Sequence, residues 1–145
     1  PHQRVVVRVA RRCEDFDGFS AGSLLQGLSM AVPGKLSHTL THLDLRGAKM
    51  ESELAVTLAA VLSDCQALTH LDLWCNRIRN KGASWLAGVM GKGSLSVLKH
   101  LDLSGNAITE EGGRKLASVF WRCSALEELN LSGNALGDEG IADLA

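Results

Sequence analysis

One phrase of eleven residues occurs four times in the chain. It reads LTHLDLRGAKM from Leu40, LTHLDLWCNRI from Leu68, LKHLDLSGNAI from Leu98 and LEELNLSGNAL from Leu126. The intervals between these leucines are 28, 30 and 28 residues. A fixed period of this size is typical of repeat proteins, in which a unit buries its hydrophobic side only against its neighbours. The sequence therefore predicts a stack of similar units that share one core.

Each unit changes from one hydrophobic spacing to another. Its leucines first follow the pattern L-x-x-L-x-L, and this alternation predicts a strand with one buried face. Segments such as KGASWLAGVM and GRKLASVF then space their apolar residues by three and four, which predicts a helix. Asn76, Asn106 and Asn134 stand between the two patterns, where an amide side chain can satisfy turn backbone groups. Each unit is thus predicted to be a strand, a turn and a helix.

These motifs resemble the leucine-rich repeat family, in its ribonuclease-inhibitor-like class with units of about 28 residues. The resemblance implies an α/β solenoid, a horseshoe with a parallel concave sheet and convex helices. Residues 39–145 are predicted to form four such repeats, the last one truncated within its helix. For this reason we expect the chain to be a fragment of a longer leucine-rich repeat protein. The first of the four repeats is atypical, since Ala48 and Leu54 replace its asparagine and glycine.

Residues 1–38 match the repeat pattern less well. VVVRV is compatible with a strand, and Leu24 and Leu28 echo Leu58 and Leu62 at a distance of 34 residues. Pro33 and Gly34 mark the place where the additional length is expected to form a loop. We interpret residues 1–38 as a degenerate first repeat with a loop insertion.

The composition gives no reason to expect nucleic acid or a membrane as a partner. The chain has 15 Lys and Arg against 16 Asp and Glu, a net charge of -1. No apolar run approaches the roughly 18 to 20 residues of a membrane helix. Cys65 and Cys123 belong to units that are not adjacent, and at about 10 Å they are too far apart for a disulfide. Free, buried thiols lead us to expect a cytoplasmic location, and Cys75 is interpreted as an ordinary turn residue.

Stacking aligns equivalent polar residues into columns. One column is His42, His70 and His100, and another is Asp44, Asp72 and Asp102, continued by Asn130. Such columns can form a metal site, an acid–base pair, or a simple product of repetition. We favour repetition, because parallel side chains do not converge as zinc ligands must, and we predict no catalytic, metal or cofactor site. The neighbouring carboxylates are expected to raise the pKa of the histidines.

The concave face is predicted to bind another protein with a basic or mixed surface. Four acidic side chains and one basic side chain occupy its outward positions. Trp74 is expected to contact the partner rather than pack on Arg46, whereas Trp85 and Trp121 are expected to pack between helices. The predicted binding residues are His42, Asp44, Arg46, His70, Asp72, Trp74, His100, Asp102, Ser104, Glu128 and Asn130.

Three classes of function remain, and the first two follow from the resemblance. The first is a protein-interaction module, as in NOD-like receptors and ribonuclease inhibitor. The alternative is a GTPase-activating regulator of a small GTPase, similar to Ran GTPase-activating proteins, which share this repeat class. A hydrolase that uses the histidine and aspartate columns is the least favoured, and the chain is predicted not to be an enzyme.

Overall fold

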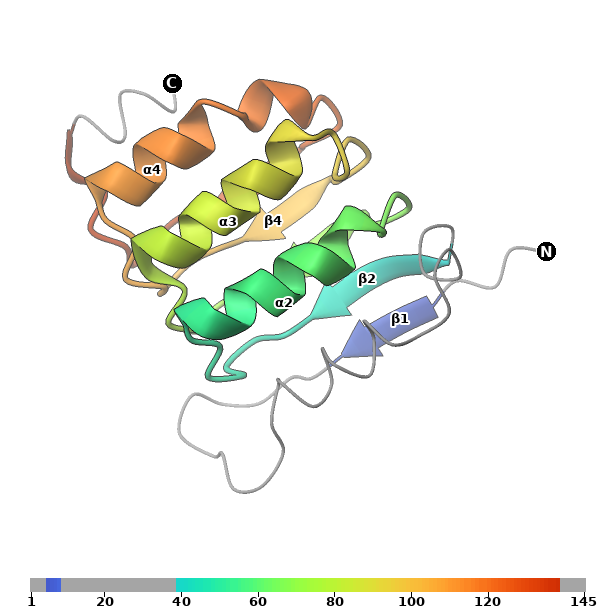
Figure 1. Ribbon diagram of the computed structural model, residues 1–145, viewed down its shortest axis with the longest axis horizontal. Helices are drawn as coiled ribbons and strands as arrows, with labels where there is room; N and C mark the ends of the chain where they lie inside the picture. Colours follow the sequence, from blue (N-terminus) through green and yellow to red (C-terminus); the bar gives the residue numbers. More distant parts are fainter. Residues whose placement is uncertain (1–4, 9–38, 139–145) are drawn as a thin grey trace.

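The computed structural model describes residues 5–8 and 39–138, and its strands form one parallel sheet in chain order. The strands are β1 (Val5–Arg8), β2 (Leu40–Asp44), β3 (His70–Asp72), β4 (His100–Asp102) and β5 (Glu128–Asn130). The helices are α2 (Ser52–Ser63), α3 (Arg79–Gly91) and α4 (Glu110–Ala117), with the short 3₁₀ helix η1 (Phe120–Arg122). The three described α-helices lie side by side over one face of the sheet (Figure 1). This arrangement confirms the predicted α/β solenoid.

The strands pair without any slip in register from β2 to β5. Leu43, Leu71, Leu101 and Leu129 lie side by side in this order, as do the residues that precede and follow each of them. Successive side chains of a strand point to opposite faces of the sheet, so the leucines share one face and the polar columns share the other. The predicted alignment of equivalent residues is therefore confirmed.

The leucine face of the sheet and the helices enclose the hydrophobic core. Leu43, Leu71 and Leu101 are at most 2% exposed, and the helix residues Leu62 and Leu116 are fully buried. Removing apolar surface from water stabilises a fold by about 25 cal/mol per Å². The shared leucine core is therefore the main source of stability.

The asparagines after the strands connect neighbouring units. The Asn76 side chain donates from Nδ2 to Leu45 O and Leu73 O, and its Oδ1 accepts a hydrogen bond from Met50 N. In the same way Asn134 Nδ2 donates to Leu103 O in the preceding unit. Each side chain thus satisfies buried backbone groups of its own turn and of the preceding turn, as predicted for these asparagines.

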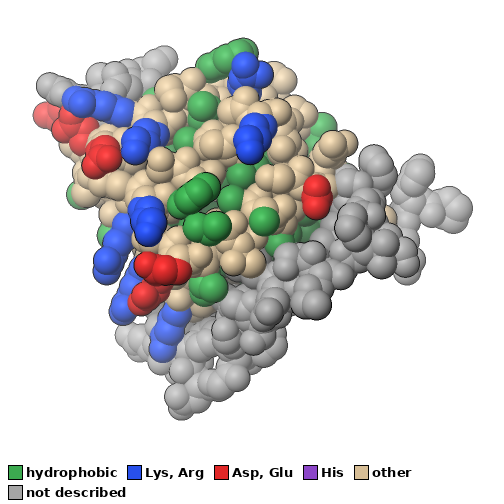
Figure 2. All heavy atoms as spheres, viewed as in Figure 1, with side chains coloured by type: hydrophobic (Ala, Val, Ile, Leu, Met, Phe, Trp, Pro, Cys, Tyr) green, Lys and Arg blue, Asp and Glu red, His purple; other side chains and the backbone are tan. Residues whose placement is uncertain are grey.

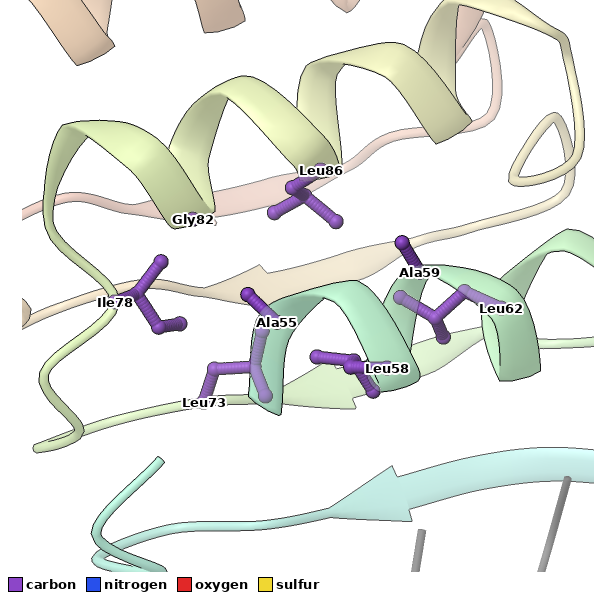
Figure 3. A pocket seen from close by; sticks show the side chains of 8 residues that line it. All are labelled: Ala55, Leu58, Ala59, Leu62, Leu73, Ile78, Gly82 and Leu86. Atoms are coloured by element: carbon purple, nitrogen blue, oxygen red, sulfur yellow. The ribbon is translucent and has the colours of Figure 1, made fainter. Parts of the chain in front are cut away.

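Small residues let the helices pack closely. A Cβ atom on Gly82 would lie 2.4 Å from Ile78 Cγ2 and 3.2 Å from Ala55 Cβ, so only glycine fits there. Figure 3 shows Ala55 of α2 facing Gly82 at the start of α3, with Leu86 further along the same side. The free space enclosed by these side chains is about 10 Å³ and is lined by apolar groups alone. This space belongs to the packed core and is too small for a ligand.

Several predictions concern single segments. Residues 92–97 form turns between α3 and β4, within the one interval that is 30 rather than 28 residues long. The degenerate repeat is described only at β1, which pairs in parallel with β2, and its predicted helix and loop insertion lie outside the described residues. The end of the last repeat, from residue 139, also lies outside them.

The cysteines follow the prediction in part. Cys65 and Cys123 are free and buried, as expected from their places in the repeat. Burial raises the pKa of the Cys65 thiol to about 11, and the thiol donates to Val61 O. Cys75 is disulfide-bonded, so the interpretation as an ordinary turn residue is wrong for its sulfur. Free and bonded cysteines together do not indicate a cellular compartment.

Two tryptophans lie on the helix side. Trp121 is 70% exposed in η1, with Arg122 over its ring at 4.4 Å, so the expected packing between helices is wrong for this residue. Its place after α4 ends, rather than within the helix, removes it from the helix interface. Trp85 on α3 is 45% exposed and packs only in part.

Candidate functional site

The sheet face that points away from the helices forms an open groove of about 430 Å³, here named the sheet groove. Figure 2 shows the opposite, helix-covered face, on which no described histidine is visible. The sheet groove is lined by His42, Leu43, Asp44, Arg46, His70, Leu71, Asp72, His100, Asp102 and Glu128. Eight of these residues belong to the predicted binding face, so the structure brings most of that set together in one groove.

The aspartate column has a structural role in every unit. Asp72 Oδ1 accepts a hydrogen bond from Trp74 N at 3.0 Å, and Asp102 Oδ1 accepts one from Ser104 N at 2.8 Å. Asp44 binds the backbone of the residue two positions later in the same manner. In the last unit Asn130 Oδ1 takes this place at 3.1 Å from Ser132 N. An oxygen at this position therefore closes the end of each strand, and a negative charge is not required for it.

Arg46 neutralises one end of the aspartate column. Its Nη2 lies 2.8 Å from Asp44 Oδ2, and its Nε lies 3.0 Å from Asp44 Oδ1. The same Nε is 3.4 Å from Asp72 Oδ2. The guanidinium group thus bridges two adjacent strands, and Asp44, the closer partner, raises the pKa of Arg46.

Asp72 lies between two other aspartates of the column and meets Arg46 at 3.4 Å. Burial raises the pKa of its carboxyl group, and the Trp74 backbone N–H opposes this rise. The charges of Asp102 and Asp44 raise the pKa further, while Arg46 lowers it. The upward direction means that burial and the neighbouring carboxylates disfavour the ionised form of Asp72.

The histidine column is a stack of imidazole rings. The ring centroids are 4.0 Å apart between His42 and His70 and 4.1 Å apart between His70 and His100, with planes inclined by 11° and 22°. Thr69 Oγ1 lies 2.8 Å from His70 Nδ1, and Glu128 Oε2 lies 2.9 Å from His100 Nδ1. The rings are therefore held face to face along the sheet.

The expectation that the histidines titrate above their ordinary pKa is wrong for His70. Burial lowers the pKa of His70, and the flanking rings of His42 and His100 lower it further, while Glu128 acts in the opposite direction. A charged ring between two close imidazoles is costly, because any charge on its neighbours repels it. The carboxylates lie in the next column and do not offset this effect at His70.

Trp74 lies beside the sheet groove at the end of β3, with 42% of its surface exposed. Its Nε1 is 3.8 Å from the position that a Cβ atom of Gly105 would take, so the indole leans toward the next unit. Gly105 has a φ of 66° and no side chain, which leaves this space open. The tryptophan thus presents an accessible ring beside the acidic column, as the binding prediction requires.

The other predicted residues differ in accessibility. Ser104 is only 5% exposed, and its hydroxyl group donates to Asp102, so it offers the least surface of the predicted set. Asn130 is exposed and donates from Nδ2 to Asp102 Oδ2 at 3.2 Å. Glu128 is exposed at the end of the histidine stack. The predicted set is thus continuous in space, although Ser104 contributes mainly by orienting Asp102.

The threonines that precede two of the histidines are positioning residues that the sequence analysis missed. The hydroxyl oxygens of Thr41 and Thr69 lie 2.9 and 2.8 Å from the Nδ1 atoms of His42 and His70. Thr69 also donates from Oγ1 to Thr41 O. The repeated dipeptide TH was the available signal, whereas the third unit has Lys99 at this position.

Within residues 5–8 and 39–138, no group of three or more His, Cys, Asp or Glu side chains is arranged to hold a metal ion. None of the helices described there has the length and apolar character needed to cross a membrane.

Comparison with known proteins supports the interpretation of the repeats. A family model described as "Leucine rich repeat" matches residues 66–136, and a second one, "Leucine Rich repeat", matches residues 36–59. The ribonuclease-inhibitor-like class stays a prediction.

Two curated relatives are named Tonsoku-like protein. The Bos taurus protein is 33% identical over 130 residues, which are 86% of this chain and 9% of the relative. The Mus musculus protein is 35% identical over 130 residues, which are 86% of this chain and 10% of the relative. The chain therefore spans about a tenth of the length of these relatives. Together with the parallel sheet, the leucine core and the asparagine turns, the family matches identify the chain as a member of the leucine-rich repeat family.

Proposed function

We propose that the sheet groove binds another protein, and that the contacting segment of this partner is basic. The observation that carries the proposal is the sheet groove itself, in which aligned strands place four carboxylates and one guanidinium group around an open space of about 430 Å³. Leucine-rich repeats generally act as protein-interaction modules. Fold alone does not define a function, so the argument rests on the residues of the groove.

The shape of the groove favours a polypeptide over a small molecule. Small-molecule sites are typically enclosed and mostly apolar, with a few polar groups that fix orientation. The sheet groove instead extends over the strands from β2 to β5, and charged or imidazole side chains make up most of its lining. An extended segment that crosses successive strands would meet a similar set of groups every ~4.8 Å.

The charges favour a basic segment. Asp72 and Asp102 lie on adjacent strands, and the raised pKa of Asp72 reflects the mutual repulsion in this column as well as burial. A positive charge from a partner would relieve that repulsion. His70 adds little positive charge near neutral pH, since burial and the flanking imidazoles lower its pKa. The groove therefore keeps an acidic character where partners would meet it.

The contacts of the histidines do not favour a hydrolase. A catalytic base of the serine-hydrolase kind is oriented by a carboxylate at hydrogen-bond distance. His70 instead meets Thr69. His100 does meet a carboxylate, that of Glu128 at 2.9 Å, but Glu128 is exposed, whereas the carboxylate of such a triad is buried. The carboxylates of Asp72 and Asp102 accept hydrogen bonds from the backbone at the ends of their own strands. Binding therefore accounts for this face better than catalysis does.

Selection of short random peptides displayed on phage tests the proposal with the 145-residue chain as bait. We expect the selected peptides to be net positive and to shift the NMR signals of groove residues such as His70 and Asp72. The double variant Asp72→Asn and Asp102→Asn should bind them about tenfold or more weakly. Asp64→Asn, which removes an exposed carboxylate at the end of α2, is the matched control and should bind normally.

Two results would contradict the proposal. One is that the peptide-induced shifts fall on the helices while the groove signals stay unchanged. The other is that the double variant and the Asp64→Asn control bind the selected peptides equally well.

A further inference from the structure

Arg46 shows how the sheet groove accommodates a guanidinium group. It lies between the aspartates of two adjacent strands, with its Nη2 at 2.8 Å from Asp44 and its Nε at 3.4 Å from Asp72. The two carboxylates are paired in register across β2 and β3. One planar cation thus compensates two charges that would otherwise repel each other.

The next pair of strands repeats the two carboxylates and lacks the cation. Asp72 and Asp102 are in register across β3 and β4, as Asp44 and Asp72 are across β2 and β3. The residue equivalent to Arg46 in this second unit is Trp74. Among the described residues, the hydrogen-bond partners of the Asp102 carboxylate are the neutral groups of Ser104 and Asn130. Asp72 meets a cation only at the more distant of the two Arg46 contacts.

Trp74 gives this second position an aromatic side. Its backbone N–H binds Asp72 at 3.0 Å, which fixes the residue beside the carboxylate. Its indole is accessible to solvent and leans toward Gly105, immediately after the strand that carries Asp102. Arginine guanidinium groups stack on tryptophan faces and bind carboxylates through parallel hydrogen bonds. An aromatic ring next to two carboxylates offers both kinds of contact.

We propose that the space between Asp72 and Asp102, beside Trp74, binds an arginine side chain of the partner. This inference rests on the proposed function, because it names the group through which the basic segment contacts the sheet groove. The incoming guanidinium would repeat, one unit further along the stack, the place that Arg46 takes between Asp44 and Asp72. Arginine suits the site better than lysine, since a planar fork spans two carboxylates and stacks on an indole, whereas an ammonium group acts as a point charge.

N-acetyl-arginine amide is a suitable probe, because it presents this side chain without a peptide. It is titrated into the chain while the NMR signal of the Trp74 indole N–H is followed. We expect a saturable shift with the arginine compound and at least about tenfold weaker binding of the citrulline compound, which has the same shape and no charge. The lysine compound should bind with intermediate affinity.

Matched variants locate the site. Asp102→Asn should weaken binding of the arginine compound about fivefold or more, while Asp64→Asn should leave it unchanged. Trp74→Leu, read through the backbone amide signals of Asp72 and Ser104, should also weaken it, whereas Trp85→Leu on α3 should not. Equal shifts with the citrulline compound, or unchanged binding in Asp102→Asn, would overturn the inference.

The two proposals fail in different ways. If selected basic peptides occupy the sheet groove but the arginine compound leaves the Trp74 signal unchanged, the arginine site is refuted and the groove remains a binding face. If no peptide shifts the groove signals, the proposed function fails, whatever the arginine compound does.

Discussion

Replacing Asn76 by alanine is expected to destabilise the fold more than replacing Asn106, although Asn106 is the more deeply buried residue. Asn76 is 5% exposed and Asn106 is fully buried. Burial alone would predict the opposite order. The difference comes from which hydrogen-bonding groups each substitution leaves without a partner.

The Asn76→Ala variant loses an acceptor that the core needs. Asn76 Oδ1 accepts the N–H of Met50 at 2.9 Å, and Met50 is fully buried. A buried N–H that loses its acceptor costs about 1–3 kcal/mol. The carbonyl groups of Leu45 and Leu73, which accept from Asn76, keep second donors in Ala48 N and Asn106 Nδ2. The additional cost is therefore confined to the Met50 N–H and to the lost packing of the amide.

The Asn106→Ala variant leaves fewer buried hydrogen-bonding groups without a partner. The carbonyls of Leu73 and Leu103, to which Asn106 donates, keep Asn76 and Asn134 as donors. The Oδ1 atom of Asn106 is buried and has no hydrogen-bond partner among the described residues. Removing an unsatisfied buried oxygen relieves a cost of about 1–3 kcal/mol. We therefore expect Asn76→Ala to lower the free energy of unfolding by at least about 2 kcal/mol more than Asn106→Ala.

The unpartnered oxygen has a structural cause in the preceding turn. The Oδ1 atoms of Asn76 and Asn134 bind Met50 N and Ile108 N, which follow left-handed residues at Lys49 and Ala107. In the intervening unit the left-handed residue is Arg79, three positions after Asn76 instead of one. The turn therefore follows a different path, and Arg79 N binds the backbone carbonyl of Asn106.

Urea unfolding followed by circular dichroism measures the difference. Both variants and the unsubstituted chain are compared at constant pH, and the slope with urea concentration is fitted for each, because a changed slope would show that the variants unfold through different states. Equal losses of unfolding free energy in the two variants, or a larger loss in Asn106→Ala, would refute the argument from unpaired hydrogen-bonding groups. Burial of the side chain would then predict the order of the two variants better.

Three further predictions concern single residues. Gly82→Ala should lower the free energy of unfolding by about 1–3 kcal/mol, because its Cβ would lie 2.4 Å from Ile78 Cγ2. Gly88→Ala on the same helix meets open space and should raise the free energy of unfolding by about 0.5–1 kcal/mol. Urea unfolding measures both variants, and equal effects would contradict the packing argument. Burial raises the pKa of Cys65 to about 11, so this thiol should resist iodoacetamide at about pH 8 in the folded chain and react with it in urea. Mass spectrometry of labelled peptides measures both reactions. Fast labelling of Cys65 in the native chain would contradict its burial. The raised pKa of Asp72 means that its ionised form is disfavoured in the fold, so the contribution of Asp72 to the free energy of unfolding should rise as pH falls through that pKa. Unfolding curves between about pH 6 and pH 4 should show this rise relative to Asp72→Asn. A decrease in the contribution of Asp72 over this pH range would contradict the prediction.

The repeat units could be predicted from the sequence because they depend on local patterns. Alternating leucines, the asparagine and the helix spacing each carry the same period, so strand, turn and helix all follow from one alignment. The columns His42–His70–His100 and Asp44–Asp72–Asp102 also followed, since equal units must align equal residues. The Ran-type alternative and the cytoplasmic location stay predictions.

Side-chain conformations were harder to predict, because they depend on contacts that the repeat does not encode. Burial lowers the pKa of His70, and the flanking rings of His42 and His100 lower it further, in a stack that depends on how the imidazoles turn. Trp121 follows the helical spacing in sequence, yet α4 ends at Ala117 and leaves the indole exposed. Cys75 has a φ of 55° at a position where the three other units have glycine. The repeat pattern does not predict its disulfide bond.

Asn130 indicates how structure and binding can be separated on this face. It replaces aspartate in the last unit, and its Oδ1 still accepts the Ser132 N–H as the aspartates accept theirs. An oxygen at this position is thus enough to close the strand, while the charges at Asp72 and Asp102 also repel each other across adjacent strands. Because closing the strand does not require this charge, we propose that it serves a contact outside the chain. Asp→Asn substitutions in this column should therefore weaken binding of a cation while leaving the strand ends intact.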